Sequence, residues 1–149
     1  MSNTHYYDVD LNWEKERMGV MSSPVLQNGI EVATPPEFPK GMEGIWSPEH
    51  LLVAAVNSCL MTTFLAIAEN SKLKFSSFTS RATGKLEKTS EGYQITEVIL
   101  YPKVMITNEE DRSRMERVLQ KSEAACLITN SIKAKVTMKP GIMVEQLIA

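Results

Sequence analysis

The chain has two cysteines, and their placement indicates thiol chemistry. Cys59 lies within an uncharged, helix-like run over residues 51–68, and Cys126 follows 67 residues later, just after a second helical pattern. Two thiols on two elements allow a protein to oxidise one thiol and resolve it with the other. Burial in apolar surroundings disfavours the reactive thiolate. We therefore expect Cys59 to need a cation, and an arginine from another element suits best because it stays charged and can also bind a carboxylate.

Other interpretations of the two cysteines stay open at this point. A buried cysteine is most often a small core hydrophobe, and this applies to each of the two taken alone. A zinc site made of both cysteines with His5 and His50 is a second alternative, although these spacings match no common zinc pattern. The sequence contains no C-x-x-C pair, so a thioredoxin-like site is not expected.

Composition and charge argue against several classes of partner. The formal net charge is −2, whereas binding to nucleic acid or to an anionic membrane requires a basic face. The 149 residues, of which 43% are hydrophobic and 23% charged, predict one globular domain over residues 1–149. The polar N-terminal residues lack a leader pattern, so we expect a cytoplasmic location, where disulfides are usually transient and catalytic.

The run over residues 51–68 is long enough to raise the question of a membrane helix. It contains Asn57, Ser58, Thr62 and Thr63, and its flanks lack basic or aromatic anchors. A helix that is apolar on nearly all sides is otherwise a central core helix, and we interpret the run in this way. A chain of this length supplies few elements to cover such a helix, so a second copy packed against it, in a homodimer, would cover the remaining face.

Local signals predict the elements of the N-terminal half. Residues 5–33 are interpreted as short strands, with a turn signal at residues 27–29. The proline-rich connector over residues 34–41 can be neither helix nor central strand. The Ser-Pro-Glu sequence at residues 47–49 then begins a helix that should run to about Asn70, because serine can cap, proline fits the first helical position, and glutamate suits the positive end of the dipole.

The C-terminal half predicts a hairpin, a helix and a last strand. Residues 73–106 resemble two long strands joined by a turn. Thr107 and Glu110 match a capping box that opens a second helix, and Cys126 is predicted on the inward face of that helix near its C-terminal end. Alternation over residues 132–139 predicts a half-exposed strand. Strands and helices without strict βαβ alternation indicate an α+β fold with antiparallel sheet.

Three segments carry a more specific pattern. They are Trp13-x-x-x-Arg17-x-Gly19, then Phe38-x-x-Gly41 with Trp46-Ser47-Pro48-Glu49 and Ser58-Cys59-Leu60, and finally Ala125-Cys126-Leu127-Ile128-Thr129-Asn130-Ser131. Together they resemble the OsmC/Ohr family, the osmotically induced and organic hydroperoxide resistance proteins. The resemblance implies an α+β fold in which antiparallel sheets wrap around long central helices in an intertwined homodimer, with two active sites near the subunit interface.

The resemblance also implies a function, a cysteine-based peroxidase that reduces organic hydroperoxides to alcohols. Cys59 matches the peroxidatic cysteine, which forms a sulfenic acid, and Cys126 the resolving cysteine, which completes a Cys59–Cys126 disulfide. Glu49 matches the glutamate of the Pro-Glu motif, and Arg17 the arginine that this glutamate orients. An external dithiol such as a lipoylated protein is the typical reductant. No metal and no tightly held cofactor are implied.

Several features leave alternatives to this function. By itself Arg17 fits a solvated charge, and Glu49 fits a first-turn residue that complements the helix dipole. Glu16 could compete for the Arg17 guanidinium, and Asn57 is more polar than the small or apolar residue expected before Ser-Cys. The alternatives in function are a non-catalytic protein, which would bind an apolar ligand in the pocket that a hydroperoxide would otherwise occupy, and a redox sensor, which would exchange disulfides with proteins.

Overall fold

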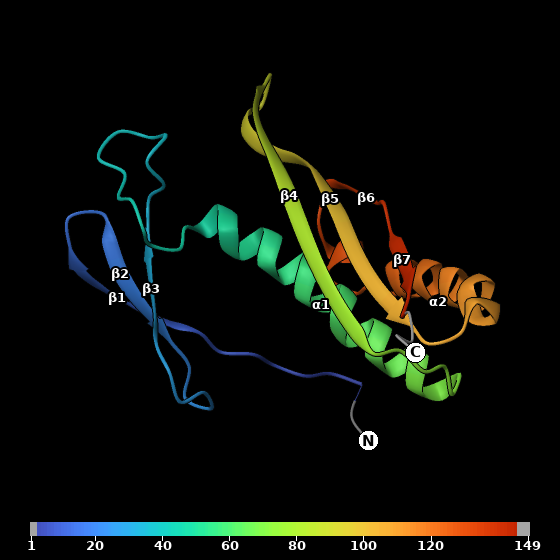
Figure 1. Cartoon of the computed structure of the whole chain (residues 1–149). Helices are drawn as coiled ribbons and strands as arrows, with labels where there is room; N and C mark the ends of the chain where they lie inside the picture. Colours follow the sequence, from blue (N-terminus) through green and yellow to red (C-terminus); the bar gives the residue numbers. More distant parts are fainter. Residues whose placement is uncertain (1–2, 146–149) are drawn as a thin grey trace. The chain divides into compact units, whose positions relative to one another are not determined.

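The computed structural model describes residues 3–145, and its internal contacts divide the chain into two compact units, residues 1–51 and residues 52–149 (Figure 1). The first unit holds a small antiparallel sheet and the first residues of a long helix. The second holds the rest of that helix, a larger sheet and a second helix. The predicted α+β class is therefore confirmed.

The first unit is a three-stranded meander in the order β1-β2-β3. Its strands are β1 (Asp10–Lys15), β2 (Met18–Ser22) and β3 (Ile30–Ala33). They confirm the short strands and the proline-rich connector that the sequence predicts. The turn before β3 lies at residues 23–26, where the N–H of Leu26 donates a hydrogen bond of 3.1 Å to the Ser23 carbonyl oxygen, and not at the predicted residues 27–29. A Cβ added at Gly19 would lie 2.7 Å from the carbonyl oxygen of Asn12, so β1 and β2 approach this closely only because a glycine occupies the position.

The long helix α1 (Pro48–Asn70) begins and ends where the sequence predicts. The side chain of Ser47 caps it, since the backbone N–H of His50 donates a hydrogen bond of 3.1 Å to Ser47 Oγ. Its fully buried side chains recur at every fourth position, which places them on one stripe of the helix. They are Val56, Leu60, Phe64 and Ala68.

The larger sheet is built on a long antiparallel hairpin of β4 (Ser77–Thr89) and β5 (Gly92–Ile106). Two short strands, β6 (Lys135–Met138) and β7 (Gly141–Val144), pair one after the other with the second edge of β5, and both run parallel to it (Figure 1). The sheet is therefore mixed, and its two parallel pairs add to the antiparallel arrangement that the sequence predicts. The half-exposed strand predicted over residues 132–139 corresponds to β6.

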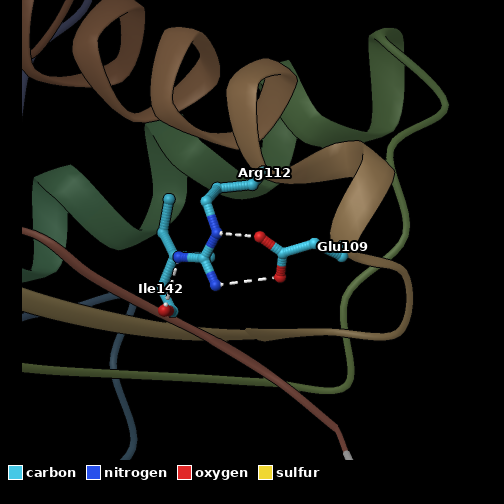
Figure 2. A network of polar contacts seen from close by, with 3 residues as sticks. All are labelled: Glu109, Arg112 and Ile142. Atoms are coloured by element: carbon cyan, nitrogen blue, oxygen red, sulfur yellow. Dashed lines mark hydrogen bonds and ion pairs between the residues drawn. The ribbon is translucent and has the colours of Figure 1, made fainter.

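The start of the second helix differs from the predicted capping box. A 3-10 turn, η1 (Glu109–Asp111), precedes α2 (Arg112–Ala124), and no side chain makes a capping hydrogen bond at either start. Instead the Arg112 guanidinium donates two hydrogen bonds to the Glu109 carboxylate, of 2.7 and 3.1 Å, and a third of 2.9 Å to the carbonyl oxygen of Ile142 in β7 (Figure 2). The capping-box prediction was wrong because these bonds organise the turn around Glu109 and Arg112.

The core of the second unit forms where α1 and α2 pack on the inward face of β5. Two clusters of buried side chains, one toward each end of α1, share the half-buried Phe78 and Met138 at their margins. Phe64 stacks on Phe78 at a ring-centroid distance of 4.7 Å. The close approach of α1 to β4 depends on Gly84, because a Cβ there would lie 2.4 Å from Val53 Cγ2.

By length and composition, α1 could also cross a membrane. One such helix is weak evidence, because the central helix of a globular protein passes the same test. The buried stripe that α1 presents to the sheet and to α2 is that of a core helix on one of its sides.

Candidate thiol site

Cys59 lies near the middle of α1 and is only partly buried, less deeply than the sequence indicates. Its Sγ is 3.9 Å from Thr63 Oγ1, one helical turn further along. A cavity of about 300 Å³ opens beside it. The cavity is lined by Ala55, Ser58, Cys59, Thr62, Leu127 and Ile128. A small molecule in this cavity would therefore meet the Cys59 sulfur.

Cys126 is fully buried and lies in a turn beyond the end of α2, not on the helix as predicted. The helix ends at Ala124, after which the N–H of Asn130 donates a hydrogen bond of 3.1 Å to the Cys126 carbonyl oxygen. The short 3-10 turn η2 (Thr129–Ser131) closes the segment. This geometry turns the chain back toward α1 and brings Leu127 and Ile128 to the Cys59 cavity.

The structure brings the two thiols close enough for each to shift the pKa of the other, and neither is in a disulfide. Burial by itself would raise the pKa of Cys59, but hydrogen bonds from the Cys126 thiol, the Ile128 amide, the Thr63 hydroxyl and the Leu127 amide lower it below the ordinary thiol value. The pKa of Cys126 is raised, first by its burial and then by the hydrogen bond to Cys59 and the charge there. Of the two thiols, Cys59 therefore loses its proton more readily, and Cys126 holds its proton more tightly.

Two backbone amides are among the groups that lower the pKa of Cys59. The sequence predicted a cation beside Cys59, and the amides of Leu127 and Ile128 are further groups that lower the Cys59 pKa and favour its charged form. Amides carry no side-chain signal in a sequence, so only the folded turn after Cys126 could reveal them. Thr63 could have been found, since its position four residues after Cys59 places both on one face of the helix.

Arg17 and Glu49 both belong to the first unit. Arg17 is exposed in the tight turn between β1 and β2, beside a cavity of about 610 Å³ whose walls include Trp13 and Thr34. Glu49 lies in the first turn of α1, as predicted. The ion pairs among residues 3–145 include none between Arg17 and either Glu49 or Glu16. The structure thus brings the two cysteines together, whereas the Arg17 guanidinium and the Glu49 carboxylate form no ion pair in it.

The unexpected Asn57 has a structural role. Its Nδ2 donates a hydrogen bond of 3.0 Å to the backbone carbonyl oxygen of Ser80, which links α1 to β4. A small or apolar residue at this position could not make the link. The polar side chain is therefore part of the helix–sheet contact.

Among residues 3–145, no group of three or more His, Cys, Asp or Glu side chains could hold a metal ion.

Comparisons with known proteins identify related sequences and structures. Residues 41–140 match the family model of OsmC-like proteins. The chain is 24% identical over 144 residues to the uncharacterized protein YmaD of Bacillus subtilis, and the alignment covers 93% of each protein. It is 26% identical over 129 residues to peroxiredoxin OsmC of Escherichia coli, and this alignment covers 85% of this chain and 90% of the relative. A solved OsmC-like protein of unknown function from Vibrio cholerae superposes with a TM-score of 0.83 at 25% identity, covering 92% of this chain and 99% of the other.

Proposed function

Because the chain belongs to the OsmC-like family, we propose that it is a cysteine-based peroxidase that reduces organic hydroperoxides to alcohols. The observation that carries the proposal is the pair of free, hydrogen-bonded thiols with opposite pKa shifts, one of which opens on a cavity. The relative from Escherichia coli is named a peroxiredoxin. A solved protein of the same fold from Legionella pneumophila is named an organic hydroperoxide resistance protein.

In the proposed reaction the Cys59 thiolate attacks one oxygen of the O–O bond. The bond breaks, the alkoxide leaves and takes a proton to become the alcohol, and Cys59 becomes a sulfenic acid. The peroxide is reduced by two electrons, which the Cys59 sulfur loses. The Cys126 sulfur then attacks Cys59 and water leaves, which yields the Cys59–Cys126 disulfide and protects Cys59 from further oxidation. The mutual influence of the two thiols on each other's pKa supports this second step, since it requires the attacking sulfur to lie near Cys59.

The roles of Arg17 and Glu49 rest on the family resemblance. Arg17 would favour the Cys59 thiolate and counter the negative charge that develops on the departing oxygen. Glu49 would hold the guanidinium by a bidentate ion pair. The two residues must therefore pair in the active enzyme.

The catalytic cycle closes when an external dithiol reduces the disulfide. A dithiol, such as that of a lipoylated protein, attacks one sulfur of the disulfide and leaves as its own disulfide, which restores both cysteines. A cytoplasmic location fits this requirement, because reducing systems there return thiols to the reduced state.

We further propose that the functional form is a homodimer built from one domain per chain. All six residues of β1 are exposed, including Leu11 and Trp13, and Met61 and Leu65 on α1 are 40% and 41% exposed. An exposed apolar surface of this size is typical of a protein–protein interface, and a second copy of the chain would bury it. The match to the family model spans residues 41–140 and crosses the boundary between the two units, which supports one domain.

The test treats the reduced protein with one equivalent of an alkyl hydroperoxide and measures its intact mass. Loss of two hydrogens is expected in the wild type as the disulfide forms. Cys59→Ser should keep its mass, because the attacking thiolate is absent. Cys126→Ser should gain oxygen, because the sulfenic acid has no partner. Cys59→Ser and Cys126→Ser thus serve as controls for each other.

The same measurement separates the alternatives. An unchanged mass over minutes would exclude the peroxidase and favour a protein that binds an apolar ligand beside an inert thiol. Disulfide formation without turnover in the presence of a dithiol would favour a redox sensor. Oxidation that is equally fast in Cys59→Ser would show that Cys59 is not the peroxidatic residue.

A further inference from the structure

A separate hollow of the second unit lies on the β4–β5 hairpin. Its volume is about 710 Å³, within the range of small-molecule sites. It is lined by Thr79, Ser80, Arg81, Thr83, Tyr101 and Lys103. The strand register places Arg81 opposite Tyr101, and Thr79 opposite Lys103. Because alternate residues of a strand share a face, Arg81 and Lys103 are diagonal neighbours on one side of the sheet, about 7–8 Å apart.

The two cations of this hollow lack a neutralising partner. Neither Arg81 nor Lys103 belongs to an ion pair among residues 3–145, and no carboxylate lines the hollow. Glu97, an acid of β5 on the same face, lies in register between Lys85 and Lys135. Neighbouring like charges on paired strands repel each other. Arg81 and Lys103 are neighbours in a chain whose formal net charge is −2, so their proximity does not follow from a basic composition.

The hollow has the donors that an oxyanion needs. A guanidinium offers a planar fork of N–H groups to two oxygens, and an ammonium adds a point charge beside it. The hydroxyls of Thr79, Thr83 and Tyr101 can donate further hydrogen bonds. The volume leaves room for more than a bare ion. We propose that this hollow binds a small molecule that carries a phosphate group, at a site separate from the two cysteines and independent of the proposed peroxidase function.

The proposal can be tested by NMR titration of the full chain with inorganic phosphate and, separately, with glycerol phosphate at constant ionic strength. Saturable shifts of amide signals are expected within residues 79–83 and 99–103. Arg81→Gln and Lys103→Gln should each raise the dissociation constant about tenfold or more, because each removes a charged donor. Glycerol phosphate should bind at least as tightly as inorganic phosphate.

Lys85→Gln is the matched control, because it removes one positive charge from the same strand. The Lys85 side chain already pairs with Glu87 at 3.4 Å, so its loss should change the dissociation constant by less than about twofold. An equal effect of Lys85→Gln would mean that only the total charge matters and would overturn the site. Absence of saturation, or equal shifts with chloride, would overturn it too. Rejection of glycerol phosphate would overturn the assignment to a small molecule and indicate a free-ion site.

Discussion

Oxidation of Cys59 and Cys126 to a disulfide should stabilise the fold by about 3 kcal/mol. The cysteines are 67 residues apart in sequence, and a cross-link that closes a loop of this length lowers the entropy of the unfolded chain by an amount worth about 4 kcal/mol at 25 °C. The disulfide removes the hydrogen bond between the thiols, whose net contribution is about 1 kcal/mol. By linkage, the fold stabilises the disulfide equally, which lowers its reduction potential by about 65 mV relative to the unfolded chain.

Urea unfolding of the oxidised and reduced proteins, followed by circular dichroism, measures this difference. The oxidised form should show a higher free energy of unfolding and a smaller slope with urea, because its unfolded state exposes less surface. The Cys59→Ser, Cys126→Ser double variant, carried through the same oxidation, controls for other chemical changes. It should unfold alike before and after treatment.

A disulfide verified by mass in a protein that gained no stability would refute the reasoning. The two sulfurs would then need a distortion of α1 or of the turn after α2 in order to join, and the strain would cancel the entropic gain. In that case the contact between the thiols would not prepare them for a disulfide.

Two further predictions concern the thiol pair and the core. The rate of Cys59 alkylation should rise with pH and level off at a lower pH than the rate for an unstructured thiol, because the lowered pKa of Cys59 lets its thiolate form at lower pH. Cys126→Ala should move this curve of rate against pH to higher pH, because it removes a hydrogen-bond donor. A curve that Cys126→Ala leaves in place would contradict the assigned cause. Phe64→Ala should lower the free energy of unfolding by about 4 kcal/mol and Phe64→Leu by about 1 kcal/mol, since Phe64 is fully buried and stacks on Phe78. Urea unfolding measures both values. A loss below about 1 kcal/mol in Phe64→Ala would contradict that packing.

Elements with local signals could be predicted from the sequence. Helix α1 begins after Ser47 because a serine side chain can cap the backbone N–H three residues later, and this contact involves only neighbours in the chain. The β4–β5 hairpin likewise follows from two long strand patterns joined by a short turn. The family could also be recognised, because its motifs are short and ordered.

Features that depend on distant residues could not be predicted in this way. Thr107 and Glu110 have the spacing of a capping box, yet Arg112 pairs with Glu109 and with the carbonyl oxygen of Ile142, 30 residues further on. The parallel pairing of β6 and β7 with β5 is also absent from the alternation pattern, which predicts a strand but not its neighbour.

The two thiols likewise combine a feature that the sequence predicts with one that depends on distant residues. The sequence by itself determined which residues carry the sulfurs and that Cys59 lies on a central helix. Only the tertiary structure decided the direction in which their pKa values shift, because the pKa of Cys59 depends on its burial and on hydrogen bonds from Cys126 and from the amides of Leu127 and Ile128. These groups act through space over a few ångströms while lying nearly 70 residues away along the chain. Burial and hydrogen bonding, which set a pKa, follow from packing and have no fixed spacing in sequence.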